Sequence, residues 1–69
     1  AYVEIYTREG MILQRKLIKE LEQQLPGFFI RVHRSYLINE NYIDQKKANL
    51  MVINKIKIPV SRNYKENLN

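Results

Sequence analysis

The sequence contains no cysteine, which excludes disulfide bonds, thiolate nucleophiles and cysteine-ligated zinc. It has a single histidine and so no second imidazole for a histidine metal site, and we expect neither a metal nor a cofactor. Glycine and proline are scarce, with 2 residues of each. The glycines, Gly10 and Gly27, stand apart and do not form the glycine-rich loop that cradles a nucleotide phosphate.

Long apolar runs are missing as well. No run approaches the roughly 18 to 20 residues that span a membrane, and residues 1–5 lack the basic-then-apolar order of a signal peptide. We therefore expect a cytoplasmic protein without membrane contact. The 69 residues, 45% hydrophobic and 28% charged, allow one small globular domain whose core is too thin for a large catalytic cleft.

Positive charge is in excess, with 12 basic against 7 acidic residues and a net charge of +5. The two signs balance in residues 1–30, so the whole excess lies in residues 31–69. A one-sided excess suits a polyanionic partner, because phosphate neutralisation releases counterions. For charge alone, a basic surface without a partner is an equally good interpretation.

Strand-like alternation dominates the chain, so we predict a mostly β fold with antiparallel strands. One stretch has helical spacing instead: its apolar residues run from Leu17 to Leu25, and Pro26 ends the helix. Ser61 is a candidate cap for a short C-terminal helical turn at residues 62–68. The expected strands are residues 2–7, 11–14, 28–32, 36–38, 50–53 and 56–60, with turns at 8–10, 39–41 and 54–55 and a loop at 44–49.

A polar cluster, His33-Arg34-Ser35, interrupts two apolar strand-like segments where a strand must end or bend. The planar guanidinium of Arg34 suits guanine edges or phosphate oxygens, and Ser35 with the loop amides suits phosphate. The plainer interpretation is that His33 packs partly buried, Ser35 completes a turn and Arg34 is solvated. A catalytic triad would also need an orienting carboxylate and an oxyanion hole, which nothing signals, so we expect no enzyme.

A second polar cluster follows the last predicted strand. It places Arg62, Asn63 and Lys65 at the start of the C-terminal helical turn. The free amides of a helix N-terminus and nearby cations favour an anion. An ordinary terminal cap with a solvated arginine is the plainer alternative.

Together the two clusters resemble the LytTR family of DNA-binding domains, found at the C-termini of bacterial response regulators. The resemblance is strongest over residues 28–43 (FFIRVHRSYLINENYI) and 58–68 (IPVSRNYKENL), and weaker over residues 2–25. It implies an elongated β fold that binds specific double-stranded DNA sequences and regulates transcription by inserting loops into major grooves. It also implies a dimer on repeated half-sites and a receiver domain in the full-length protein.

The resemblance also assigns roles to individual residues. Groove centres on one face of a duplex lie about 34 Å apart, so the two clusters are expected at opposite ends of the domain. The implied DNA-binding residues are Arg34 (base or phosphate), Ser35 (phosphate), His33 (support), Arg62 (base reading), and Asn63 and Lys65 (phosphates), with Arg31 and Tyr64 as weaker candidates.

Residues 1–69 are then a single domain that lacks the opening strands of the family. This leads us to expect an unpaired edge along residues 2–7, and a chain that is unstable or self-associating on its own. Two other functions are compatible with the residues. RNA or single-strand binding would stack bases on tyrosine and phenylalanine, although Phe28 and Phe29 have core-like positions. A protein-interaction module would pair through a β-edge and show no salt-dependent affinity for nucleic acid.

Overall fold

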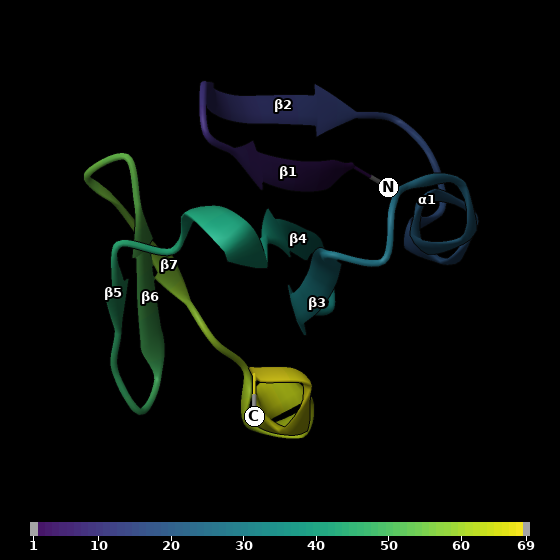
Figure 1. Cartoon of the computed structure of the whole chain (residues 1–69). Coiled ribbons are helices and arrows are strands. Elements are labelled where there is room, and N and C mark those ends of the chain that lie inside the picture. Colours follow the sequence, from purple (N-terminus) through teal and green to yellow (C-terminus); the bar gives the residue numbers. More distant parts are fainter. Residues whose placement is uncertain (1, 69) are drawn as a thin grey trace.

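The computed structural model describes residues 2–68. The described chain is mostly β, as predicted, with two sheets, one short α-helix and two 3-10 segments (Figure 1). In chain order the elements are β1 (Val3–Thr7), β2 (Gly10–Gln14), α1 (Ile18–Gln24), β3 (Phe29–His33), β4 (Tyr36–Asn39), η1 (Glu40–Tyr42), β5 (Gln45–Lys46), β6 (Leu50–Ile53), β7 (Ile56–Pro59) and η2 (Arg62–Leu68).

The first sheet has the strand order β2-β1-β4-β3 and is mixed. β1 and β2 form the predicted hairpin, in which Gly10 has φ +128, a backbone conformation that favours glycine. β1 and β4, however, are parallel, with Ile5 opposite Leu37. The prediction of antiparallel strands did not include this parallel pair. Parallel neighbours are joined by a long crossover and not by a turn, and here the connection contains β2, α1 and β3.

β1 is an interior strand, so the expected unpaired edge along residues 2–7 is wrong. β1 bonds to β2 on one side and to β4 on the other. The wrong expectation assumed that a missing strand would leave β1 at the edge, whereas β4 returns to occupy that side. Among the described strands of this sheet, the outer positions belong to β2 and β3.

The second sheet is antiparallel, in the order β5-β6-β7. Asn54 and Lys55 both have positive φ, 50 and 67, as a type I′ turn requires, and this confirms the predicted hairpin turn. β5 forms inside the segment predicted as a loop, because its backbone pairs with β6; next to it, the Asp44 amide donates to the Val52 carbonyl at 2.7 Å. A short exposed edge strand needs no apolar side chains, which is why its pattern resembles a loop.

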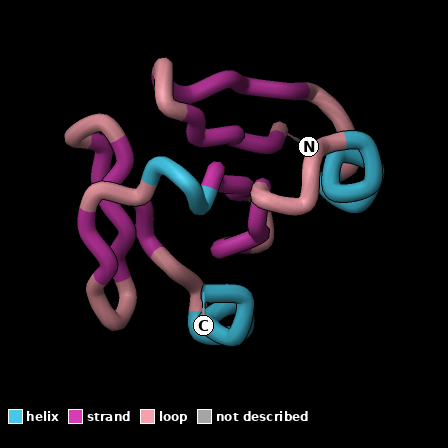
Figure 2. The backbone as a smooth tube through the Cα atoms, in the orientation of Figure 1, coloured by secondary structure: helices cyan, strands magenta, loops and turns pink. Residues whose placement is uncertain are grey.

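The first sheet is covered on both faces. The second sheet packs on one face: its Met51, Ile53 and Ile58, with Val60 directly after β7, join Tyr6, Val32 and Ile38 in one core cluster. Leu21 of α1 packs on the other face, in a smaller cluster with Val3, Ile5 and Leu37. Figure 2 shows α1 and the second sheet on opposite sides of β3 and β4. Leu17 was predicted on the apolar side of the helix but precedes α1 and is 63% exposed.

Tyr6 is a buried phenol in the core between the sheets. Its hydroxyl donates to the carboxylate of Glu4, and its ring meets the Tyr36 ring edge-on, with centroids 5.9 Å apart. Burial above all, and then the hydrogen bond and negative charge of Glu4, raise the pKa of Tyr6 well above its ordinary value of 10.0. The folded protein therefore favours the protonated phenol.

This pKa shift predicts a loss of stability in alkali. A phenol whose pKa is raised in the folded state makes its full contribution to the stability of the folded protein at pH values below the unfolded-state pKa, near 10. That contribution is lost as the pH rises from there toward the folded-state pKa. The free energy of unfolding should fall by about 1.4 kcal/mol per pH unit above pH 10 for this group. In urea titrations, Tyr6→Phe should make the slope shallower, whereas the exposed control Tyr2→Phe should not. Equal slopes for both variants would contradict the assignment.

Candidate nucleic-acid interface

The two polar clusters lie next to each other. η2 packs along β3 (Figure 1). The Ser61 amide donates to the Val32 carbonyl at 2.8 Å, and Asn67 Nδ2 donates to the Arg31 carbonyl at 2.7 Å. In the sequence, Arg34 lies two residues after Val32 and Arg62 lies one residue after Ser61, so both arginines are close to the first of these bonds. We call residues 33–35 together with residues 62–65 the contact region.

This arrangement corrects the expectation that the clusters lie at opposite ends of the domain. The longest Cα extent of the described chain is 28 Å, which is shorter than the groove repeat of about 34 Å. The backbone bond between Ser61 and Val32 brings the clusters together although almost thirty residues separate them in the chain. They therefore form one region and not two contacts a groove repeat apart.

Arg31 connects β3 to the turn that follows it. Its Nε donates to the His33 carbonyl at 3.3 Å, and its Nη2 donates to the Arg34 carbonyl at 2.8 Å. One guanidinium thereby binds two successive carbonyls at the point where the chain reverses. Hydrogen bonds from a charged donor are stronger than neutral ones, so Arg31 fixes the path of the backbone at Arg34.

The same guanidinium also reaches two other elements. Its Cζ lies 4.8 Å from the centre of the Tyr64 ring in η2. Its Nη1 lies 3.6 Å from Glu22 Oε1 in α1. The Arg31 side chain is only 17% exposed, so it acts inside the protein. Arg31 was a weaker candidate for direct DNA contact, and its contacts instead indicate that it supports the contact region.

His33 also supports the turn. Its Nδ1 accepts a hydrogen bond from the Ser35 amide at 3.2 Å, and its ring stacks on Tyr36 with centroids 4.2 Å apart. The Ser35 carbonyl accepts from the Glu4 amide at 2.9 Å, which anchors the turn to β1. This geometry matches the plainer sequence interpretation, in which His33 is partly buried and Ser35 completes the turn.

The remaining side chains of the contact region face solvent. Arg34, Arg62, Asn63 and Lys65 are all exposed. The predicted C-terminal helical turn is present as the 3-10 segment η2, in which the Tyr64 amide donates to the Ser61 carbonyl at 3.0 Å. Because η2 is short, its side chains rather than its amides give the region its positive charge. The arrangement can present a cationic surface to a polyanion, with Arg34 and Arg62 free to reach outward.

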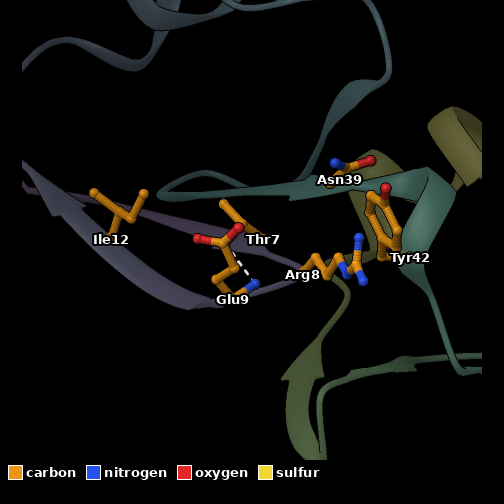
Figure 3. A pocket seen from close by; sticks show the side chains of 6 residues that line it. All are labelled: Thr7, Arg8, Glu9, Ile12, Asn39 and Tyr42. Carbon is orange, nitrogen blue, oxygen red and sulfur yellow. Dashed lines mark hydrogen bonds between the residues drawn. The ribbon is translucent and has the colours of Figure 1, made fainter.

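A separate depression lies away from the contact region. Arg8 is at its centre, with the guanidinium carbon 5.6 Å from the centre of the Tyr42 ring, and Figure 3 shows the two side chains together. It is open to solvent and includes none of the predicted site residues. Nor do three or more metal-ligating side chains gather anywhere in residues 2–68. The residues drawn in Figure 3 are Thr7, Arg8, Glu9, Ile12, Asn39 and Tyr42.

Comparison with known proteins identifies the family of this chain. A family model described as the LytTr DNA-binding domain matches residues 1–69. No curated protein and no solved structure gave a match. The chain is a DNA-binding domain of mostly β structure, from a non-enzymatic class that acts in transcription regulation. It belongs to the LytTR family.

The sequence indicated Arg31 only as a weaker candidate for DNA contact and did not indicate its supporting role. Nor did it indicate that Glu22 and Asn67 take part in that support. One signal was available: Arg31 stands between Ile30 and Val32 in an otherwise apolar strand. A charged residue in such a strand needs internal partners if it is not to leave its charge buried alone.

Within residues 2–68, no helix has the length and apolar character needed to cross a membrane.

Proposed function

We propose that this LytTR domain recognises a specific double-stranded DNA sequence through the contact region and regulates transcription as the output domain of a response regulator. Family membership supports DNA binding. The observation that carries the proposed surface is the Ser61–Val32 backbone bond, which brings together the two polar clusters with their exposed Arg34, Arg62 and Lys65. The protein would act in the bacterial cytoplasm, under the control of a receiver domain.

The proposed roles follow from exposure and chemistry. Arg62 would read base edges, because a guanidinium can donate two hydrogen bonds to guanine O6 and N7. Arg34 would contact a base or a phosphate from the tip of the turn, and His33 would hold that turn. Ser35, Asn63 and Lys65 would contact phosphates, and these contacts position the domain on the duplex.

The size of the chain bears on how many copies of the protein bind one DNA site. The longest principal-axis extent of the described chain is 28 Å, less than the groove repeat of about 34 Å. The contact region of one copy would therefore occupy one major groove and its flanking phosphates. A second copy would occupy the next groove, which is the reason that we propose a dimer on repeated half-sites.

Arg62→Ala should weaken binding to the preferred duplex by about 1–3 kcal/mol and relax the preference at particular base pairs. Selection from a random duplex library, before and after the substitution, measures both effects. If the substitution weakens all sequences equally, Arg62 is a phosphate contact. If matched RNA binds as well as the selected duplex, the proposed function is wrong.

Lys65→Gln should lower the dependence of binding on salt. Each neutralised phosphate contributes about 0.9 to the slope of log affinity against log salt, so the slope should fall by about 1. Lys57→Gln is the matched control, because Lys57 is also exposed but lies on β7, outside the contact region. Fluorescence anisotropy at several salt concentrations tests the pair, and equal slopes for the two variants would contradict the proposed surface.

A further inference from the structure

The turn between β5 and β6 is bonded to the segment that leads into the contact region. The Lys47 amide donates to the Leu50 carbonyl at 2.8 Å, so residues 48–49 form the tip of a tight hairpin. At this tip, the Asn49 carbonyl accepts from the Val60 amide at 3.0 Å. The bond ties the β5–β6 turn to the chain between β7 and η2.

Two neighbouring amides of that chain connect three segments. The Val60 amide reaches the β5–β6 turn, whereas the Ser61 amide donates to the Val32 carbonyl at the end of β3. In Figure 1 the β5–β6 turn lies on one side of residues 60–61 and β3 lies on the other. Arg62 follows directly and begins η2. It therefore starts from a point that the β5–β6 turn flanks on one side and β3, with the turn at residues 33–35, on the other.

Lys47 gives the β5–β6 turn a positive charge. Residues 45–49 contain two lysines and no acid. The Lys47 side chain is exposed, and within residues 2–68 it has no ion-pair partner. The nearest acid in the sequence, Asp44, lies near the other turn of the sheet, where its Oδ2 accepts from the Asn54 amide at 2.9 Å. The charge of Lys47 is therefore available to an anion beside the contact region.

A DNA duplex presents phosphates on both sides of the position that Arg62 would occupy. The major groove is about 12 Å wide and lies between the two phosphate backbones. Contacts to these phosphates fix the register and orientation of a protein around its base-reading side chains. With Arg62 in the groove, the turn at residues 33–35 would meet phosphates on one side, and the β5–β6 turn would bring Lys47 to those on the other.

We propose that Lys47 is a further DNA-contact residue, which binds a phosphate on the side of Arg62 opposite to the turn at residues 33–35. The inference rests on the proposed function and extends its surface to a third segment. The other exposed hairpin lysine, Lys55, does not share this role, because its turn lies at the opposite end of β6 (Figure 1). Composition treats the two lysines alike, and only the strand pairing distinguishes them.

The salt dependence of binding tests the role of Lys47. Lys47→Gln should lower the slope of log affinity against log salt by about 1 and weaken all duplex sequences alike, because a phosphate carries no base information. The double variant with Lys65→Gln should lower the slope by about 2. Lys55→Gln is the matched control and should leave the slope unchanged. Fluorescence anisotropy at several salt concentrations measures these slopes, and equal slopes for Lys47→Gln and Lys55→Gln would overturn the proposal.

Neutral phosphate analogues locate the contact on the duplex. Methylphosphonates replace single phosphates, one at a time, in a duplex selected by the wild-type chain. One replacement should weaken binding of the wild-type chain and of Lys55→Gln but not of Lys47→Gln, since that variant has already lost the contact. If no phosphate behaves in this way, Lys47 does not contact the backbone. Circular dichroism checks that each variant is folded.

The same experiments separate this inference from the proposed function. If Arg62→Ala and Lys65→Gln have their expected effects and only Lys47→Gln matches its control, the contact region is correct and the added residue is wrong. If the wild-type chain binds no duplex, both proposals are wrong.

Discussion

Ile38→Ala should lower the free energy of unfolding by about 2–5 kcal/mol. The Ile38 side chain is 0% exposed and lies in the core cluster between the two sheets. Its truncation removes apolar contacts and leaves a cavity, since neighbouring strands cannot collapse fully into the space. Small domains are stable by only about 5–15 kcal/mol, so this loss is a large share of the total.

Urea unfolding followed by circular dichroism measures the Ile38 effect. Leu17→Ala is the control, because the 63% exposed Leu17 side chain should change stability by no more than about 0.5 kcal/mol. Ile38→Val should be intermediate, at about 0.5–1.5 kcal/mol. If Ile38→Ala and Leu17→Ala have the same effect, the packing of the second sheet on β4 is not as described.

Arg31→Ala should weaken DNA binding about tenfold or more without changing its salt dependence. The substitution removes the donors that hold the carbonyls of His33 and Arg34, and hydrogen bonds to charged groups contribute about 1.5–3 kcal/mol each. It also removes the contact with the Tyr64 ring at 4.8 Å. The turn that carries Arg34 would then be held less firmly, although the Ser61–Val32 and Asn67–Arg31 bonds to the β3 backbone would still keep η2 beside it.

Several measurements separate this positioning role from a direct phosphate contact. A fall of about 1 in the salt slope would show that Arg31 itself neutralises a phosphate. Arg31→Lys should not restore binding, because an ammonium cannot donate in the planar geometry of a guanidinium. Arg8→Ala is the matched control, since Arg8 also lies over a tyrosine ring, at 5.6 Å, but outside the contact region. It should leave affinity nearly unchanged.

Local sequence signals predicted most of the secondary structure. Alternation located the strands, and Pro26 with Gly27 marked the end of the helix segment. The two-residue turn at Asn54 and Lys55 was predicted and adopts the positive φ values of its class. β5 was missed because its strand character comes from backbone pairing to β6 and not from its own polar side chains.

Long-range pairing was predicted less well. The parallel neighbours β1 and β4 are separated along the chain by β2, α1 and β3, so no short turn joins them. The error placed residues 2–7 at an edge that belongs to β2. The adjacency of the two polar clusters was also missed, because it depends on the backbone bond between Val32 and Ser61. The amino-acid types within each cluster do not indicate how far apart the two clusters lie in the folded chain.

The shortages that characterise this sequence determined much about the protein by themselves. Without cysteine, with one histidine and two isolated glycines, it has no means for thiol, cysteine–zinc or nucleotide-loop chemistry. The basic excess was compatible with a polyanionic partner, and the resemblance of the two polar clusters to the LytTR family then indicated DNA. Only the tertiary structure decided that these clusters form a single region, that Arg31 supports them from inside and that β2 is the open edge. Composition and local spacing report residue chemistry and strand propensity, whereas these three features depend on which strands pair across long chain separations.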